Sequence, residues 1–374
     1  MDLNQPSASA PAAVGLPGLA QLLGGLQRRG YQIIGPTVRE GAIVLDVIEK
    51  LEDLPGGWTD CQGPGRYRLE RRGDGALFGF SPGPHSWKQF LHPPEIQLCE
   101  LVREGASFRV LEPSAPPPRR AFLGVRACDL AAIRIQDRVL LEDRYADAVY
   151  QERRRRVFIV AVNCTQASRT CFCVSMGAGP RAQGPFDLAL TELTGPEGHL
   201  FVVEPGSEAG AQVLSEIDRR EARPEELAQA SAALESAAQQ ISRLDTADLR
   251  RLLLGNLEHP EWDLVAARCL SCGNCTMVCP TCFCTTIEDS CDIAGARAHR
   301  RRKWDSCFTE SFSYIHGGSV RLSIKSRYRQ WLTHKLAAWV DQFGTFGCVG
   351  CGRCITWCPA GIDITAEVAA IRGG

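Results

Sequence analysis

The order of apolar and polar residues divides the chain into a strand-rich first half and a helical second half. Residues 16–29 have the pattern of a short amphipathic helix, and the signals over 31–204 are mainly those of strands. Residues 221–244 are rich in Ala and Glu, with Leu or Ile at heptad spacing, which predicts a long helix. From residue 246 onward the pattern is mostly helical. We therefore expect an α+β protein.

Two pairs of strand-like segments predict β-hairpins. Residues 66–70 and 76–80 are joined through a segment that contains Asp74-Gly75, a residue pair that favours a tight turn. Residues 188–193 and 200–204 are joined through Thr-Gly-Pro-Glu-Gly. Each pair predicts two antiparallel neighbours in a sheet.

Two continuous apolar runs, 121–125 and 157–162, predict strands that are buried on both faces. Cys128 follows the first run and Cys164 follows the second. If the two strands are parallel neighbours, both cysteines emerge at the edge where open α/β sheets bind their ligands. Four arginines at 153–156 precede the second run and are typical of a solvated face or a helix C-terminus.

The chain has 18 cysteines, and many of them are closely spaced. The run C-x₂-C-x₂-C-x₃-C-P occurs at 269–280 and again at 348–359. This run is typical of bacterial iron–sulfur proteins, whereas a structural zinc site usually has paired C-x₂-C units. The two runs therefore predict two [4Fe–4S] clusters.

The fourth cysteine of each run is expected to bind the cluster of the other run. Three thiolates that are two residues apart wrap one corner of a cubane, and the fourth points away from that corner. The expected ligands are Cys269, Cys272, Cys275 and Cys358 for the first cluster, and Cys348, Cys351, Cys354 and Cys279 for the second.

A second group of cysteines predicts a third [4Fe–4S] cluster, although its spacing matches no standard run. The group consists of Cys128, Cys164, Cys171 and Cys173. The alternative is that these are small buried hydrophobic residues, as unpaired cysteines often are.

Three further cysteines, Cys282, Cys284 and Cys307, lie just after the first run or close to it in sequence. They could bind another metal or exchange as ligands, but packing beside the clusters is the simpler interpretation. Cys61, Cys99 and Cys291 stand alone and are assigned no role.

Charge and missing motifs exclude several classes of protein. A net charge of −1 gives no sign of nucleic-acid binding. No segment is long and apolar enough to span a membrane, and the first residues lack the features of an export signal, so we expect a cytoplasmic protein. P-loop, dinucleotide-fingerprint, H-E-x-x-H and nucleophile-elbow motifs are missing. This weighs against the alternative that the α/β region is itself catalytic.

The cluster region resembles a known family. The resemblance is carried by C-L-S-C-G-N-C-T-M-V-C-P-T-C-F-C at 269–284, W-D-S-C-F at 304–308 and C-V-G-C-G-R-C-I-T-W-C-P at 348–359, and by V-R-A-C-D-L at 125–130 upstream. It is similar to the iron–sulfur β subunit of cytosolic NAD(P)-linked [NiFe] hydrogenases, the sulfhydrogenases. The electron-transfer subunit of anaerobic sulfite reductases is similar too.

The resemblance implies a non-catalytic subunit that transfers electrons within an oxidoreductase complex. Its partners would be a γ subunit that binds flavin and NAD(P), and the small and large subunits of the hydrogenase. The sulfite reductase alternative implies the same chain of clusters, which would then supply electrons to a sirohaem subunit. Neither alternative involves a nucleic acid or a membrane.

The sequence thus predicts an N-terminal α/β domain with a mixed sheet, followed by a helical, ferredoxin-like domain with two clusters. The expected divisions are a disordered N-terminus at 1–15, the α/β domain at 16–220, a helical connector at 221–260 and the two-cluster domain at 261–374.

Overall fold

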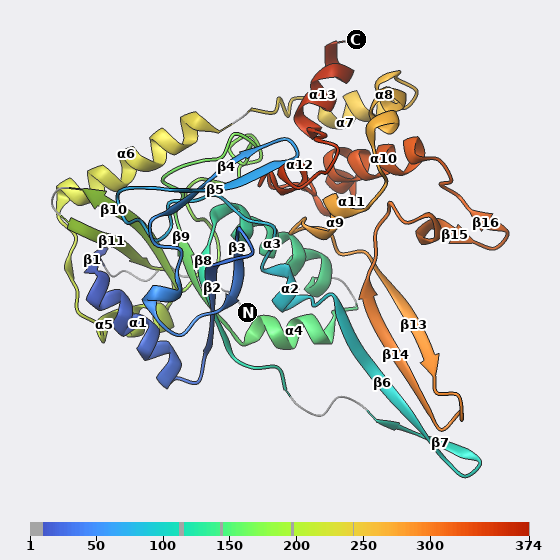
Figure 1. Ribbon diagram of the computed structural model, residues 1–374, viewed down its shortest axis with the longest axis horizontal. Coiled ribbons are helices and arrows are strands. Elements are labelled where there is room, and N and C mark those ends of the chain that lie inside the picture. Colours follow the sequence, from blue (N-terminus) through green and yellow to red (C-terminus); the bar gives the residue numbers. More distant parts are fainter. Residues whose placement is uncertain (1–9, 112–115, 143–144, 196–197, 242, 374) are drawn as a thin grey trace.

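An eight-stranded mixed sheet dominates the first half of the chain in the computed structural model (Figure 1), which describes residues 10–111, 116–142, 145–195, 198–241 and 243–373. Its four central strands are parallel, and antiparallel strands flank them on both sides. The order is β12 (Arg220–Glu221), β1 (Ala12–Gly15), β11 (Gly198–Pro205), β10 (Leu188–Gly195), β9 (Val157–Val162), β8 (Arg120–Val125), β2 (Gln32–Arg39) and β3 (Ala42–Val47).

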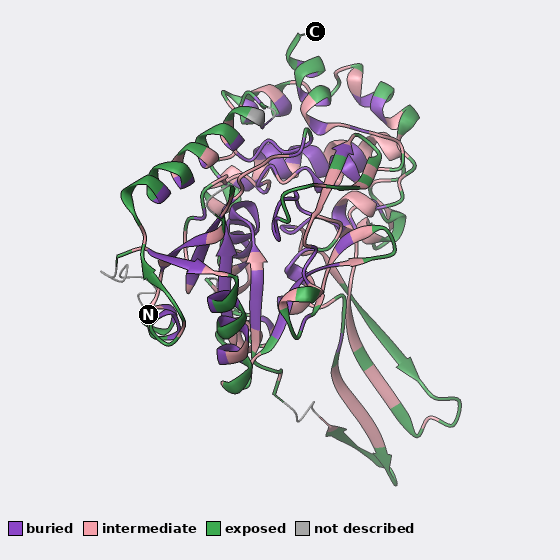
Figure 2. Cartoon of the chain, turned by 60° about the vertical axis from the view of Figure 1, so that its left-hand side comes forward, coloured by how far each residue is buried: buried purple, intermediate pink, exposed green. Residues whose placement is uncertain are grey.

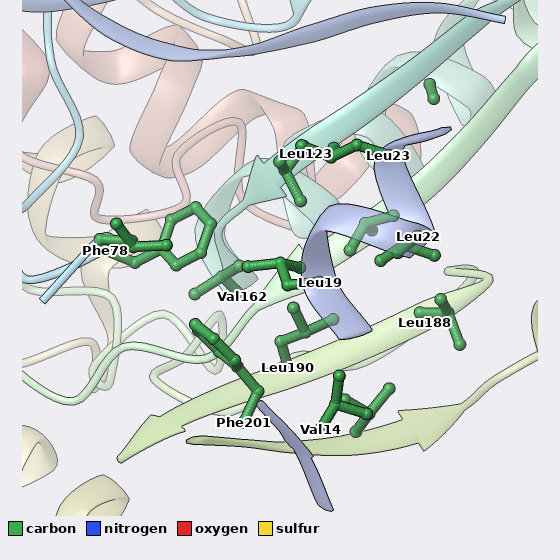
Figure 3. Packing of buried hydrophobic residues seen from close by; sticks show 14 of the residues in the cluster. Val14, Leu19, Leu22, Leu23, Phe78, Leu123, Val162, Leu188, Leu190 and Phe201 are labelled. Carbon is green, nitrogen blue, oxygen red and sulfur yellow. The ribbon is translucent and has the colours of Figure 1, made fainter. Parts of the chain in front are cut away.

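Helices cover both faces of this sheet. On one face, α1 (Leu16–Arg28) and α5 (Glu208–Ser215) pack on a core that includes Leu19, Val162 and Leu190 (Figure 3). Alternate residues of the same strands, such as Phe122 and Ile159, point to the other face. There they meet α2 (Lys88–Leu91), α3 (Ala127–Leu141) and α4 (Ala148–Arg155). This two-sided burial explains why the central strands have continuous apolar sequences.

Several sequence predictions are confirmed. The first helix is α1, the hairpin at 188–204 is β10 and β11, and the long helix is α6 (Pro224–Gln240), which packs on these two strands. The two buried strands, β8 and β9, are parallel neighbours. Arginines 153–155 lie in the last turn of α4, where they oppose the negative end of the helix dipole.

The hairpin predicted at 66–80 is wrong. β5 (Arg66–Arg71) pairs instead with β4 (Trp58–Gly63), and residues 76–80 form no strand. The N–H groups of Leu77 and Phe78 donate to the buried carboxylate of Glu192 over 2.6 and 2.8 Å. A side chain from β10 therefore satisfies the backbone that a partner strand would have satisfied.

The expected disorder of residues 1–15 is wrong for Ala12–Gly15, because β1 pairs with both β11 and β12. Residues 1–9 and 112–115 lie outside the described residues. The boundaries at 220 and 260 stay a prediction.

The second half of the chain is largely helical, as predicted. Its core contains the large side chains Trp262, Tyr328, Trp331 and Leu332. The helices are α7 (Leu249–Gly255), α8 (Glu261–Arg268), α9 (Asn274–Met277), α10 (Ile324–Thr333), α11 (Trp339–Phe343), α12 (Arg353–Thr356) and α13 (Ile364–Gly373), with a π-helical turn over His334–Ala338 between α10 and α11. No helix of the described residues is long and apolar enough to cross a membrane.

A projecting β-arm interrupts the helical region and was not predicted (Figures 1 and 2). β13 (Thr285–Cys291) and β14 (Arg297–Trp304) form its first hairpin, and β6 (Glu95–Glu104) and β7 (Ser107–Leu111) complete a sheet of order β13-β14-β6-β7. Residues 261–374 are therefore not entirely helical. The remaining short elements are β15 (Tyr314–Ile315), β16 (Gly318–Ser319) and 3₁₀ turns at Leu51–Asp53 and Glu310–Ser313.

A buried ion pair joins the sheet region to the second cysteine run. Arg353, between Cys351 and Cys354, has a guanidinium nitrogen 3.0 Å from a carboxylate oxygen of Asp129, and their side chains are 2% and 3% exposed. Arg353 also donates from Nε to the carbonyl of Gly83 over 3.0 Å. Burying one of these charges without the other would be costly.

We predict that Asp129→Ala destabilises the protein by about 3–5 kcal/mol, because it leaves the charge of Arg353 buried and unpaired. Anaerobic urea unfolding, followed by far-UV circular dichroism, should show a lower midpoint. The double variant Asp129→Leu with Arg353→Met should recover most of the loss. Asp341→Ala is the control, because it removes only an exposed pair with Arg250. An Asp129→Ala midpoint equal to that of the control would contradict this prediction.

Candidate metal centres

The two cysteine runs have the same backbone conformation. The third residue of each run is left-handed, with φ of 51° at Ser271 and 65° at Gly350. The fifth residue is left-handed too, with φ of 72° at Gly273 and 76° at Gly352. These reversals curl each loop around the space in front of its thiols, and α9 and α12 then begin and pack against each other. Glycine adopts this conformation without strain, whereas at Ser271 it has a steric cost.

The first run opens onto a cavity with mostly apolar walls, including Phe308, Tyr328 and Trp331. The first three cysteines of the run line it, and Cys358 of the second run completes the group. Cys272 is exposed, so this cavity lies near the protein surface. Its cysteines are Cys269, Cys272, Cys275 and Cys358, with Cys354 in the wall that faces the second cavity.

The second cavity is more enclosed than the first. It is lined by Cys348, Cys351 and Cys354 of the second run and by Cys279 of the first run. The fourth cysteine of each run therefore lies with the first three of the other run, which is the spatial arrangement that crossed ligation requires. Which thiols bind iron stays a prediction.

The protonation of these thiols follows from burial and local charge. Burial raises the pKa of Cys348 to about 12 and the pKa of Cys275 well above its ordinary value. Cys279 differs, because a hydrogen bond from the Cys282 thiol and the charge of Lys335 hold its pKa well below the ordinary value. Metal binding needs thiolates, so metal loading at Cys275 and Cys348 must release protons.

Backbone N–H groups point at one thiol in each run. The N–H of Ser271 donates to Cys269 Sγ and the N–H of Gly350 donates to Cys348 Sγ, both over 3.4 Å. Such hydrogen bonds to sulfur help to set the reduction potential of an iron–sulfur cluster.

The cysteines of the predicted third site also come together. Cys128 lies in the first turn of α3 beyond β8, and Cys164 follows β9. Cys171 is within electrostatic reach of Cys164, Cys173 and Cys351. Burial raises the pKa of the Cys128 and Cys171 thiols well above their ordinary value. The third cluster itself stays a prediction.

The third group is held tightly against the second run. The N–H of Phe172 donates to the carbonyl of Gly350 over 2.8 Å. A Cβ atom at Gly350 would lie 2.5 Å from the carbonyl carbon of Phe172, and one at Gly352 would lie 2.5 Å from the carbonyl oxygen of Thr170. Both positions therefore need glycine for close approach as well as for φ.

Three further cysteines lie beside the two cavities: Cys282, Cys284 and Cys307. Whether they bind metal or only pack beside the clusters stays a prediction. Cys282 is hydrogen-bonded to Cys279, and Cys307 is within electrostatic reach of Cys284 and Cys275. In the described part of the chain, no three His, Cys, Asp or Glu side chains converge closely enough to hold a single metal ion.

Two buried lysines near these thiols were missed by the sequence analysis. Lys335 and Lys88 are each 4% exposed, and Lys88 Nζ lies 3.7 Å from the centre of the Trp304 ring. Nearby thiolates, Cys279 above all, oppose the effect of burial and raise the pKa of Lys335 well above its ordinary value. A lysine in a helical pattern normally indicates a solvated face, so the sequence carries no signal for this position.

The residues present fit iron–sulfur clusters. Thiols line two cavities with few other polar groups, left-handed turns wrap each cavity, and N–H groups point at sulfur. These features define an iron–sulfur protein. Residues 268–362 match the family model of the 4Fe-4S dicluster domain, which supports [4Fe–4S] clusters in this region.

A comparison with curated proteins gives the family. The chain is 34% identical over 264 residues to the sulfhydrogenase 2 subunit beta of Pyrococcus furiosus, an alignment that covers 68% of this chain and 74% of the relative. The chain therefore belongs to the sulfhydrogenase β-subunit family, and the resemblance inferred from its motifs is confirmed. No solved structure matches it.

We predict that Cys279→Ala damages the cluster of the second run rather than that of the first, because Cys279 lies in the second cavity. Electron paramagnetic resonance spectra of the reduced protein should match those of Cys351→Ala and differ from those of Cys272→Ala. The spectra of Cys358→Ala should instead match those of Cys272→Ala and differ from those of Cys351→Ala. A Cys279→Ala spectrum like that of Cys272→Ala would refute crossed ligation.

We predict that replacing Cys171 and Cys173 together with alanine removes about four iron atoms per chain, the content of one cluster. Iron and acid-labile sulfide should be measured on anaerobically purified protein. Cys61→Ala, at an exposed cysteine, is the control and should keep its full iron content. Unchanged iron in a folded double variant would remove the third site.

Proposed function

We propose that this chain relays single electrons from a partner that binds flavin and NAD(P) to the small subunit of a [NiFe] hydrogenase, and in the reverse direction. The proposal draws on its membership of a family whose matched relative is a sulfhydrogenase subunit. The chain itself would be non-catalytic, and the large subunit would react with H₂. A cytoplasmic location is part of the same proposal.

The serial arrangement of the three thiol groups is the observation that carries this proposal. The second cavity shares Cys354 with the first cavity, and Cys351 in its wall is within electrostatic reach of the third group. Cys272 of the first group is exposed. A series that begins at the surface and continues into the α/β region suits a relay between partners better than it suits a single catalytic centre.

The chain's residues would hold, insulate and adjust the redox groups. Bound [4Fe–4S] clusters would accept and release one electron at a time. Aromatic and aliphatic side chains, such as Phe308, Trp331 and Ile364, would exclude water from the first cavity. The curled loops would fix the thiols, and the N–H groups of Ser271 and Gly350 would stabilise charge on sulfur.

We predict the composition of the native complex when it is isolated without oxygen through a tag on this chain. It should contain nickel and flavin in a constant ratio, with a large excess of iron. The measurement is metal and cofactor analysis of the eluate. Sirohaem without nickel would instead support the sulfite reductase alternative. If the chain elutes alone with neither group, the proposed relay in a complex is wrong.

A further inference from the structure

Lys335 is held in the wall of the second cavity by three hydrogen bonds. Its ammonium nitrogen lies 3.2 Å from Cys279 Sγ, 2.9 Å from Thr281 Oγ1 and 3.0 Å from the carbonyl oxygen of Gly347. Each of the three partners accepts from the ammonium group. A buried ammonium at this position brings a full positive charge to a predicted ligand sulfur.

The local fold directs this side chain inward. Lys335 belongs to the π-helical turn His334–Ala338, where the helix from α10 to α11 accommodates an extra residue. Its own carbonyl accepts from the N–H of Gly347 over 2.8 Å, so Lys335 contacts both sides of the residue that precedes Cys348. The lysine thus bridges Cys279 of the first run and the start of the second run.

The two cavities differ in charge. Lys335 is the charged residue among those that line the second cavity, whereas the described residues that line the first cavity include no lysine or arginine. Arg327, which is buried near the first run, donates to Ser271 Oγ and to the carbonyls of Arg321 and Leu322 rather than to a thiol.

This difference bears on the direction of electron transfer. An added electron makes an iron–sulfur cluster more negative, and a positive charge close to its sulfur stabilises the reduced form. Burial strengthens the effect because little water is present to screen it. Hydrogen-bond donation to the ligand sulfur acts in the same direction.

We propose that Lys335 is a positioning residue that holds the reduction potential of the second cluster above that of the first. In a forward transfer one electron would leave the first cluster and one would enter the second, and the reverse transfer would return it. The middle group of the series would therefore hold a shared electron more strongly than the first group does. This inference rests on the ligand assignment and the relay proposed above, and it assigns a role to a residue outside the cysteine runs.

The test is a redox titration of the native complex, isolated without oxygen and followed by electron paramagnetic resonance. The variants are Lys335→Met, which removes charge and donor, Lys335→Gln, which keeps a neutral donor, and Lys335→Arg, which keeps the charge. Lys50→Met, at an exposed lysine of the α/β region, is the control. The signal of the second cluster is identified as the one that Cys351→Ala removes.

We expect the midpoint potential of the second cluster to move in the negative direction in Lys335→Met and Lys335→Gln. It should stay near the wild-type value in Lys335→Arg and Lys50→Met. An unchanged potential in Lys335→Met with the cluster intact would overturn the proposal. Loss of the second cluster in both neutral variants would make Lys335 a purely structural residue, which would overturn it as well.

The failure of this inference is distinguishable from the failure of the ligand assignment. If the signal that moves is instead the one that Cys272→Ala removes, Cys279 belongs to the first cluster, and Lys335 does not act on the second cluster. If the complex lacks nickel and flavin but the shift is present, the proposed partners are wrong and the role of Lys335 holds.

Discussion

The contact between the second cysteine run and the α/β region is the constraint on which the rest of this structure depends. Its centre is the buried pair of Arg353 and Asp129, whose sequence neighbours include Cys354 on one side and Cys128 on the other. A buried ion pair contributes little net stability, but it penalises any arrangement that separates its members. Gly350 and Gly352 add a steric requirement, because a side chain at either position would collide with the 170–173 loop. Together these contacts fix the α/β region against the cluster loops.

The sequence was sufficient for features that depend on local spacing. The two cysteine runs predicted the cluster region, and the apolar runs at 121–125 and 157–162 predicted two buried strands, which lie side by side. The hairpin at 66–80 failed for a non-local reason, since Glu192 supplies the hydrogen bonds that a partner strand would have supplied. The β-arm was not predicted for two reasons. Its strands are solvated and charged, with cross-strand ion pairs such as Arg300 with Asp289. In addition, β14 pairs with β6, a strand far away in sequence.

In the candidate site, too, local spacing predicts some features and long-range folding determines the others. Spacing within a run indicates which thiols share a loop, and the known geometry of such runs indicates the crossing of Cys279 and Cys358. The third group depends on the folding of the sheet, because Cys128 and Cys164 follow β8 and β9, which are neighbours only in the folded sheet. Lys335 lay beyond prediction, since its burial follows from a π-helical turn that no sequence pattern specifies.

Charge balance connects these features to function. Thiolate-bound clusters carry negative charge, and a buried negative charge needs compensation. The described residues provide that compensation unequally: Lys335 bonds directly to Cys279, Arg353 lies beside Cys351 in the same group, and Arg327 near Cys269 bonds elsewhere. The second group is also the one that contacts both others. In the proposed relay, the middle position would therefore be the one at which the protein best stabilises an added negative charge.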